Sequence, residues 1–223
     1  MMGEKAHALT RPGAGPEIQA GETGLAPIYS AARALLGGDG RSMLAGHIAP
    51  RPHDLIVDFA CGGGDLALQL ARLQPAATIL GVDRDPALIA RAQARPAPAN
   101  AAISFACAAP DDVPELLRSV CATKVVLTLK DIHSPVDKSR FLDLAHSVLD
   151  PRGALFVIDH GAQRTALMRS LFNADRVRRG VAPTDGRDTL SSMIRAAGFV
   201  AVDEALSWSS TTGTMSLFRA RAS

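Results

Sequence analysis

The sequence predicts an α/β fold in which a mostly parallel sheet of seven strands carries helices on both faces. Five short apolar segments alternate with helical patterns along residues 54–159, and this alternation is typical of a parallel sheet covered on both sides. Two more strand-like segments follow near the C-terminus, joined by a short Ser/Thr/Gly connection. Because that connection is too short for a crossover helix, we expect the last two strands to pair as an antiparallel hairpin.

The predicted elements follow one another without an internal repeat. The expected strands are residues 54–59, 77–83, 102–107, 125–129, 154–159, 199–208 and 214–222. The expected helices are residues 28–36, 41–49, 66–73, 86–95, 113–120, 138–149 and 187–197. Asp85 precedes a proline in the first helical turn and is predicted to cap that helix, whereas Gly198 is predicted to end the last helix.

The length and composition predict a single domain. Residues 25–223 suffice for an ordinary domain, and hydrophobic residues make up 47% of the chain, which excludes wholesale disorder. Residues 1–24 are rich in Gly, Pro and polar side chains. They offer little to pack into a core, so we expect them to form a disordered tail.

Charge, cysteine content and hydropathy exclude several classes of protein. The formal net charge is +2 and aromatic residues make up 4% of the chain, so neither predicts nucleic-acid binding. Three cysteines without paired spacing argue against a disulfide scaffold or a cysteine zinc site, and they suit a reducing cytoplasm. We find no apolar stretch long enough to span a membrane and no apolar signal segment, so we expect a cytoplasmic protein without stable membrane association.

A glycine-rich turn after the first predicted strand is the strongest functional signal. The strand ends in Asp58, the chain turns through Gly62, Gly63 and Gly64, and a helix is expected to begin at about Asp65. Glycines in such a turn let the backbone approach a ligand, and free N–H groups at a helix start attract a polar or anionic group. A turn of this kind can also serve packing alone.

A second acid lies at the tip of the second predicted strand. Asp83 follows Gly64 by 19 residues, and a carboxylate there can accept hydrogen bonds from both hydroxyls of a ribose. The alternatives are a solvated strand end or a helix cap, and Asp85 suits the cap better. Together, the turn and Asp83 predict a cofactor that contains a nucleoside.

Two classes of cofactor fit these features. Gly62-x-Gly64-x-x-Ala67 satisfies the dinucleotide fingerprint, so an NAD(P)-dependent oxidoreductase is one candidate. Against it, Asp58 lies in the strand before the turn, where it would repel a pyrophosphate but attract a cationic amino acid. The long segment before the first strand and the closing hairpin also depart from a dinucleotide-binding fold.

From about Pro27 to the C-terminus, the chain resembles the class I S-adenosylmethionine-dependent methyltransferases, which have a Rossmann-like fold. Asp58-x-Ala60-x-Gly62-x-Gly64 is similar to the family's D-x-G-x-G-x-G loop, and GVDRDPALIARA to its ribose-binding strand and helix. LDPRGALFVID and MIRAAGFVAVDE resemble the segments around its fifth and sixth strands. The loop is similar to that of the ubiquinone and menaquinone C-methyltransferases, whose substrate motifs are not recognisable here.

The resemblance implies an enzyme that uses S-adenosylmethionine and releases S-adenosylhomocysteine. A sulfonium methyl group would pass in line to a small-molecule acceptor without a metal ion, and orientation would supply much of the rate. The leading helices, residues 27–49, would form a lid over cofactor and substrate, with Tyr29 as a candidate contact. The positions that match the family's cofactor site are Asp58, Ala60, Cys61, Gly62, Gly64, Asp83, Arg84, Ala109, Pro110 and Leu129.

Several positions depart from the family's pattern. Ala60 replaces a glycine, and we expect it to be tolerated with a negative φ angle. Ala109 stands where many relatives carry an acid, so adenine recognition is expected to pass to Asp111, to Asp112 or to backbone groups. Lys124 stands where relatives often carry an aspartate. The departures at Ala109 and Lys124 keep open a further possibility, a cofactor-binding scaffold or partner subunit without methyl-transfer activity.

Candidate general bases follow from the topology, because ligands of open α/β sheets bind beyond the carboxyl ends of the strands. His133 comes four residues after the fourth predicted strand, and His160 directly follows the fifth. A histidine pKa near 6.5 suits base catalysis at neutral pH, although both residues also suit a capping or surface role. Lys130 and Asp131 lie at the same rim and are candidate substrate or lid residues.

A basic segment follows the fifth predicted strand and has two interpretations. It either recognises an acidic acceptor as part of a substrate lid or forms a solvated helix face. Its arginines are Arg164, Arg169, Arg176, Arg178 and Arg179. We expect either a monomer or a homodimer.

Overall fold

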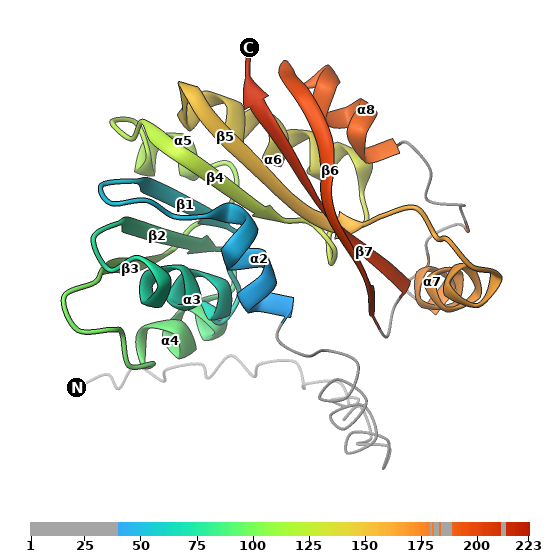
Figure 1. Ribbon diagram of the computed structural model, residues 1–223, viewed down its shortest axis with the longest axis horizontal. Coiled ribbons are helices and arrows are strands. Elements are labelled where there is room, and N and C mark those ends of the chain that lie inside the picture. The colour runs from blue at the N-terminus through green and yellow to red at the C-terminus, as the bar shows by residue number, and fades with distance from the viewer. Residues whose placement is uncertain (1–39, 179, 181–182, 184–188, 211–212) are drawn as a thin grey trace, which may run out of the picture.

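A computed structural model describes residues 40–178, 180, 183, 189–210 and 213–223 of the protein. Seven strands form one sheet in the order β3-β2-β1-β4-β5-β7-β6 (Figure 1). The pairs among the first five strands are parallel, whereas β7 runs antiparallel to both β5 and β6. The predicted fold class and the predicted C-terminal hairpin are therefore confirmed.

Most elements lie close to their predicted positions, but β5 begins at Leu149, five residues before the predicted strand. The strands are β1 (Leu55–Phe59), β2 (Thr78–Asp83), β3 (Ala102–Cys107), β4 (Ala122–Thr128), β5 (Leu149–His160), β6 (Phe199–Ser210) and β7 (Gly213–Ala222). The helices are α2 (Gly40–Ile48), α3 (Asp65–Leu73), α4 (Pro86–Gln93), α5 (Val113–Leu116), α6 (Pro135–Val148), α7 (Ala166–Arg178) and α8 (Thr189–Ala196).

Local chemistry sets several of these boundaries. Asp85 caps α4 as predicted, because its carboxylate accepts hydrogen bonds from two amides of the first turn. Gly198 takes a φ of 92° just after α8, which is the left-handed conformation that ends a helix. The helix α6 begins earlier than the apolar pattern indicates, since the Ser134 hydroxyl accepts from the Asp137 amide and Pro135 fills the first turn. By contrast, α5 is shorter than predicted and ends at Leu116.

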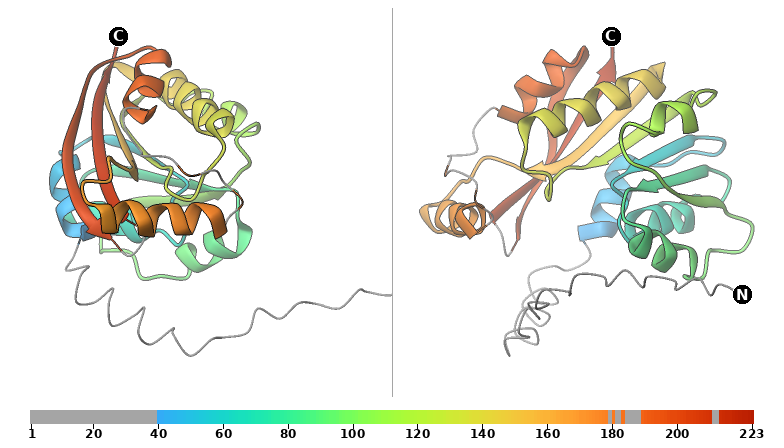
Figure 2. Two further views of the ribbon diagram at one scale, coloured as in Figure 1. Left: turned by 90° about the vertical axis from the view of Figure 1, so that its right-hand side faces the viewer. Right: turned by 180° about the vertical axis from the view of Figure 1, so that it is seen from behind.

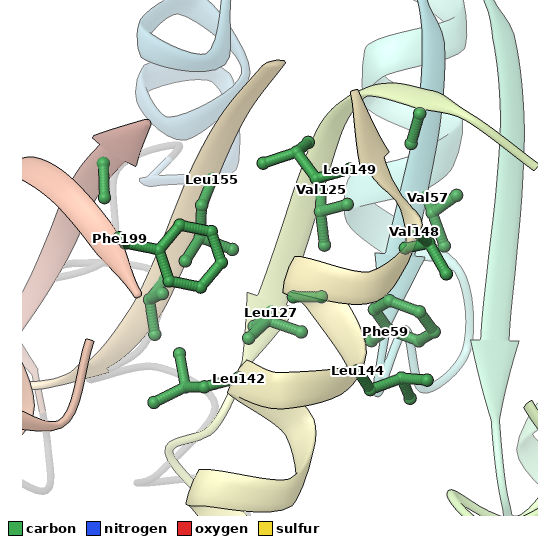
Figure 3. Close-up of a cluster of buried hydrophobic side chains, with 14 of the residues drawn as sticks. Val57, Phe59, Val125, Leu127, Leu142, Leu144, Val148, Leu149, Leu155 and Phe199 are labelled. Carbon is green, nitrogen blue, oxygen red and sulfur yellow. The ribbon is translucent and has the colours of Figure 1, made fainter. Parts of the chain in front are cut away.

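Helices cover both faces of the sheet (Figure 2). On one face, the inward side chains of β1, β4 and β5 pack against α6 and α8, and Figure 3 shows Phe59, Leu127 and Leu142 in this cluster. On the other face, α2 and α3 bury their apolar sides against Ile56 and Phe156. Each strand of the centre is thus buried on both sides, which explains why β1, β4 and β5 are apolar runs rather than alternating patterns.

The first predicted helix, residue Tyr29 and the predicted tail at 1–24 lie outside the described residues. Within the described part, α2 buries Leu44, Ala45 and Ile48 in the core. The second half of the segment predicted to form a lid is therefore a packed helix of the sheet's face. Among the described residues, none of the helices is long and apolar enough to span a membrane.

A buried glutamine fastens the connection between β5 and α7 to the hairpin. The Gln163 amide nitrogen donates to the carbonyl oxygens of Gly161 and Thr214, at 2.7 and 3.1 Å, and its oxygen accepts from the Thr214 amide at 2.8 Å. The side chain is 5% exposed, so these bonds satisfy an amide that would be costly to bury alone. They hold the segment after β5 against the start of β7, next to the predicted base His160.

Candidate active site

The carboxyl ends of β1, β2, β4 and β5 meet at one edge of the sheet, because these strands are parallel and in register. This edge receives the turn after β1, the end of β2 and the segment after β4. It is the edge at which open α/β sheets bind ligands. Most of the residues predicted for the cofactor and acceptor sites lie here.

The glycine turn has the tight backbone that its sequence predicts. Gly62 and Gly64 have φ angles of 55° and 73°, which glycine adopts without steric cost. A Cβ atom at Gly64 would lie 2.7 Å from the Phe105 ring, whereas one at Gly62 would meet nothing within 4 Å. Gly64 is thus required by packing inside the protein, and Gly62 faces open space.

Ala60 does not have the negative φ angle that we expected. Its φ is 53°, in the left-handed region. The prediction was wrong because the turn requires this conformation whichever residue occupies the position. This conformation costs a non-glycine residue roughly 1 kcal/mol.

Asp83 organises the turn as well as ending β2. Its Oδ2 accepts a hydrogen bond from the Gly62 amide at 2.7 Å, and its Oδ1 accepts from the Asp85 amide at 3.0 Å. The Gly64 amide in turn donates to the Cys61 carbonyl at 3.0 Å. Two amides that we expected to be free for a ligand are therefore used within the protein. Each carboxylate oxygen of Asp83 keeps a further lone pair.

Asp58 is the most unusual group at this edge. It is 1% exposed, and neither of its carboxylate oxygens has a hydrogen-bond partner among the described residues. Burial, with a further contribution from the charge of Asp83, raises the pKa of Asp58 to about 7. A buried carboxylate without a partner is costly, so this position is suited to a cation, which none of the described residues supplies.

The remaining candidates on the turn and on β2–β3 differ in accessibility. Cys61 is half-buried, and burial together with the charges of Asp58 and Asp83 raises the pKa of its thiol, which excludes a reactive thiolate. Arg84 and Ala109 are exposed and Pro110 is half-buried.

The segment after β4 contains one buried residue followed by two exposed, charged residues. Leu129 is fully buried, its amide donates to the Ile158 carbonyl, and its carbonyl accepts from the Ile132 amide. Only a second lone pair of that carbonyl is left for a ligand. Lys130 and Asp131, by contrast, form an ion pair at the surface, with side chains 44% and 59% exposed.

A cavity of about 230 Å³ lies beyond the ends of β4 and β5 and brings together both predicted bases. His133 and His160 line it, together with Lys130. Apolar walls come from α7, α8 and β7, and include Phe172, Leu190, Met193 and Phe218. The cavity thus places two imidazoles beside an apolar wall and several charged side chains.

His160 is held in the cavity by its packing. Its ring centroid lies 4.8 Å from that of Phe172 on α7, and its buried Nδ1 has no hydrogen-bond partner in the part of the chain that the structure describes. Burial lowers the pKa of His160, against an opposing contribution from Asp159. The imidazole is therefore neutral at pH 7 and has one nitrogen available to accept a proton.

An ion pair in the same cavity was not found from the sequence. Lys138 of α6 binds Asp159 at the end of β5, and Asp159 is 1% exposed. The other Asp159 oxygen accepts from the His160 amide at 2.7 Å. Asp159 directly precedes a predicted base, which was the one available signal, but the lysine comes from a helix 21 residues earlier.

The basic segment is mostly a solvated helix face. Arg169 is exposed on α7, Arg178 pairs with Asp175 at 2.7 Å, and Arg164 lies 3.9 Å from Glu204. Only Arg176 among those described lines the 230 Å³ cavity, where its guanidinium stacks 5.5 Å over the Phe172 ring. Arg179 lies outside the described residues.

Lys124 lies at the opposite edge of the sheet. It pairs with Ile56 near the amino end of β4, and its ammonium group binds Asp54. A departure from the family's pattern there changes no group near the glycine turn. Lys124 therefore gives no support to an inactive scaffold.

The sheet and its helices have the Rossmann-like fold of methyltransferases of known structure. Residues 56–153 match a family model described as a methyltransferase domain. The resemblance seen in the sequence is thus confirmed, for the fold as a whole and for the domain that carries the glycine turn and Asp83.

The individual relatives are methyltransferases, and this chain matches only part of the length of each. A 51-residue segment is 43% identical to trans-aconitate 2-methyltransferase of Deinococcus radiodurans, and covers 23% of this chain and 20% of that protein. The structure of CalO1, a methyltransferase of calicheamicin biosynthesis bound to S-adenosylhomocysteine, has a TM-score of 0.66 at 18% identity, over 91% of this chain and 59% of that one. Human N-acetylserotonin methyltransferase, in complex with S-adenosylmethionine, has a TM-score of 0.62 at 19% identity, over 87% and 55%. The chain therefore spans little more than half the length of these two structures and a fifth of the curated relative.

Proposed function

We propose that this protein is a methyltransferase that takes S-adenosylmethionine as methyl donor and transfers the methyl group to a small-molecule acceptor in the 230 Å³ cavity. The observation that carries the proposal is the unpartnered, buried carboxylate of Asp58 beside the glycine turn. S-adenosylmethionine has a cationic amino-acid end, which such a carboxylate attracts. The methyltransferase-domain match over the same residues supports this choice of cofactor.

In this proposal, different residues at the carboxyl edge of the sheet bind different parts of the cofactor. Asp58 attracts the ammonium group, and the open side of Gly62 lets the backbone of the turn approach the ligand. Asp83 accepts from the ribose hydroxyls with the lone pairs that its two amide partners leave. The adenine lies near Arg84, Ala109 and Pro110.

The cavity supplies the acceptor site. When bound, the cofactor supplies an electrophilic methyl group on a sulfonium centre. His133 and His160 are placed to take a proton from an acceptor that must lose one, and the neutral state of His160 suits that role. Lys130 and Arg176 add positive charges to the lining, and Asp175 and Glu204 add carboxylates.

Small-molecule acceptors are favoured by the size of the cavity, which at about 230 Å³ is close to the lower end of the range for small-ligand pockets. The structural neighbours include N-acetylserotonin methyltransferase and a methyltransferase of calicheamicin biosynthesis, and their substrates support the same class of acceptor. Because the sulfonium already activates the methyl group, we also propose that no metal ion is needed, so turnover should survive chelation by EDTA.

Calorimetric titration with S-adenosylmethionine, S-adenosylhomocysteine and NADH in parallel tests the proposal. We expect micromolar binding of the two adenosyl ligands and none of NADH. Binding of NADH alone would make the protein a nicotinamide-dependent oxidoreductase. Binding of the adenosyl ligands without turnover in an acceptor screen would favour the inactive scaffold.

A further inference from the structure

A second cavity, of about 540 Å³, lies at the amino edge of the sheet, opposite the proposed active site. Its walls come from the end of α2, from the first residues of β4 and β5, and from the β6–β7 hairpin. The strand β7 ends at this edge, where Figure 1 marks the C-terminus. The proposed function assigns no role to this cavity.

The lining of this amino-edge cavity is strongly basic. Five cationic side chains line it, against only two carboxylates, Asp54 and Asp203. The cations are Arg51, Lys124, Arg152, Arg219 and Arg221. The Asp203 carboxylate lies 3.3 Å from the guanidinium of Arg219 on the neighbouring strand.

The other carboxylate, that of Asp54, is bound by three neighbouring residues. Asp54 binds the ammonium group of Lys124 and accepts from the Arg51 amide at 2.6 Å and from the Thr123 hydroxyl at 2.9 Å. Burial by itself would raise the pKa of Asp54, but these bonds outweigh it and hold the pKa below its usual value. The side chains of Lys124 and Asp54 are only 12% and 11% exposed. The charge of Asp54 is therefore neutralised by Lys124 and does not neutralise the arginines of the cavity.

Three of the cationic side chains of this cavity are not paired with its two carboxylates. Within the described ranges, Arg51, Arg152 and Arg221 make no salt bridge, and all three are exposed around the cavity. Asp150 interacts electrostatically with Arg152 but does not line the cavity. Guanidinium groups bind phosphate and carboxylate groups through paired hydrogen bonds, more strongly than an ammonium group does.

We propose that the amino-edge cavity binds a small polyanion, a molecule that carries phosphate groups or several carboxylates. The guanidinium groups of Arg51, Arg152 and Arg221 would hold its anionic groups, and Ile48 and Phe156 would form the apolar floor. The volume falls in the range of small-molecule sites. The cations surround a cavity instead of following an extended stripe, which favours a small ligand over a nucleic acid.

Titration calorimetry with pyrophosphate and with citrate, at one fixed ionic strength, tests the proposal and separates the two anion chemistries. The protein is used with and without saturating S-adenosylhomocysteine. We compare the full chain with the double variant Arg152→Ala/Arg221→Ala and with Arg140→Ala, which removes an exposed arginine of α6 outside the cavity. A charge-conserving variant, Arg152→Lys/Arg221→Lys, provides the same comparison if the alanine pair does not fold.

We expect saturable binding of at least one anion, weakened at least tenfold in the double variant and unchanged in Arg140→Ala. The lysine variant should bind several-fold more weakly, since it loses the paired hydrogen bonds. Binding that persists with the cofactor product present places the ligand outside the methyl-transfer site, whether or not methyl transfer is found. Competition with S-adenosylhomocysteine, equal weakening in Arg140→Ala, or binding of an oligonucleotide but of neither small anion would each overturn the proposal.

Discussion

The backbone amide of Gly62 donates a 2.7 Å hydrogen bond to the carboxylate of Asp83 and so joins the turn after β1 to the end of β2. The two residues are 21 positions apart in the chain, and neither the strand nor the turn alone would fix their distance. The bond means that Asp83 shapes the proposed cofactor site before any cofactor arrives. Loss of its carboxylate should therefore affect both the turn and the ligand.

Replacement of Asp83 by alanine should weaken S-adenosylmethionine binding at least tenfold, because charge-assisted hydrogen bonds to the ribose and to the turn are lost together. Calorimetry measures the affinity, and Asp85→Ala is the matched control. Asp85 caps α4 through the Ala87 and Leu88 amides, so its loss should cost about 1 kcal/mol of folding free energy and leave the affinity intact. Unchanged affinity in Asp83→Ala would remove Asp83 from the site.

Binding of S-adenosylmethionine should be linked to the ionisation of Asp58. The pKa of this carboxyl is raised to about 7 in the free protein, and a cationic ligand would lower it. Below pH 7 the free carboxyl is protonated and must release its proton on binding, so affinity should rise from pH 6 to pH 8. Calorimetry in buffers of different ionisation enthalpy counts the protons, and Asp58→Asn should show weaker and flat binding. A flat profile in the unsubstituted protein would mean that Asp58 does not face the cation.

The same residue should carry a cost in stability. A carboxyl whose folded pKa lies above its ordinary value of 3.8 loses folding free energy as the pH rises from about 4 through 7. Three pH units at roughly 1.4 kcal/mol each give an upper estimate of about 4 kcal/mol at pH 8. Asp58→Asn should thus unfold at higher urea than the unsubstituted protein at pH 8, and show little difference at pH 4. Destabilisation by Asp58→Asn at pH 8 would contradict this account.

The two histidines of the 230 Å³ cavity should affect turnover and not cofactor affinity. His133→Ala should lower kcat with little change in S-adenosylmethionine binding; full activity across pH 6 to 9 would make His133 structural. His160→Phe keeps an aromatic ring against Phe172 but removes the base, and should lower kcat roughly 100-fold for an acceptor that must lose a proton. Because burial lowers the pKa of His160, its contribution should persist below pH 6.5.

His146→Phe is the control for that experiment. His146 on α6 also has a buried nitrogen for which no described residue is a hydrogen-bond partner, and its ring packs edge-on against Phe199 at 5.1 Å. Phe199 begins β6 at the amino edge of the sheet, so His146 lies away from the cavity. Its replacement should leave kcat unchanged. An equal loss of turnover in both variants would indicate a general effect of packing.

Ala60→Gly should stabilise the protein by roughly 0.5–1 kcal/mol, since glycine adopts the observed φ of 53° without strain. Urea unfolding at pH 6, with the m-value compared, measures the change. Ala90→Gly, at an exposed position inside α4, should instead cost up to about 1 kcal/mol. A destabilised Ala60→Gly would mean that the alanine methyl group makes packing contacts that outweigh its backbone strain.

The sequence by itself determined the fold class, because the apolar strands, the glycine turn and the short final connection each permit few arrangements. The same local signals predicted the cap at Asp85, the helix end at Gly198 and the edge at which the proposed site lies. They also confined the candidate bases to the residues that follow β4 and β5. All of these depend on contacts between residues near in the chain.

Only the tertiary structure decided what lies next to what across the sheet. The Gly62–Asp83 bond, the Lys138–Asp159 pair and the packing of His160 on Phe172 join separate elements. The burial of Asp58 likewise depends on the side chains packed around it. The sequence shows an aspartate in a strand but does not show whether water reaches its carboxylate. Burial and cross-strand distance set the charge states and the free hydrogen-bonding groups of both cavities, and these are properties of the packed molecule.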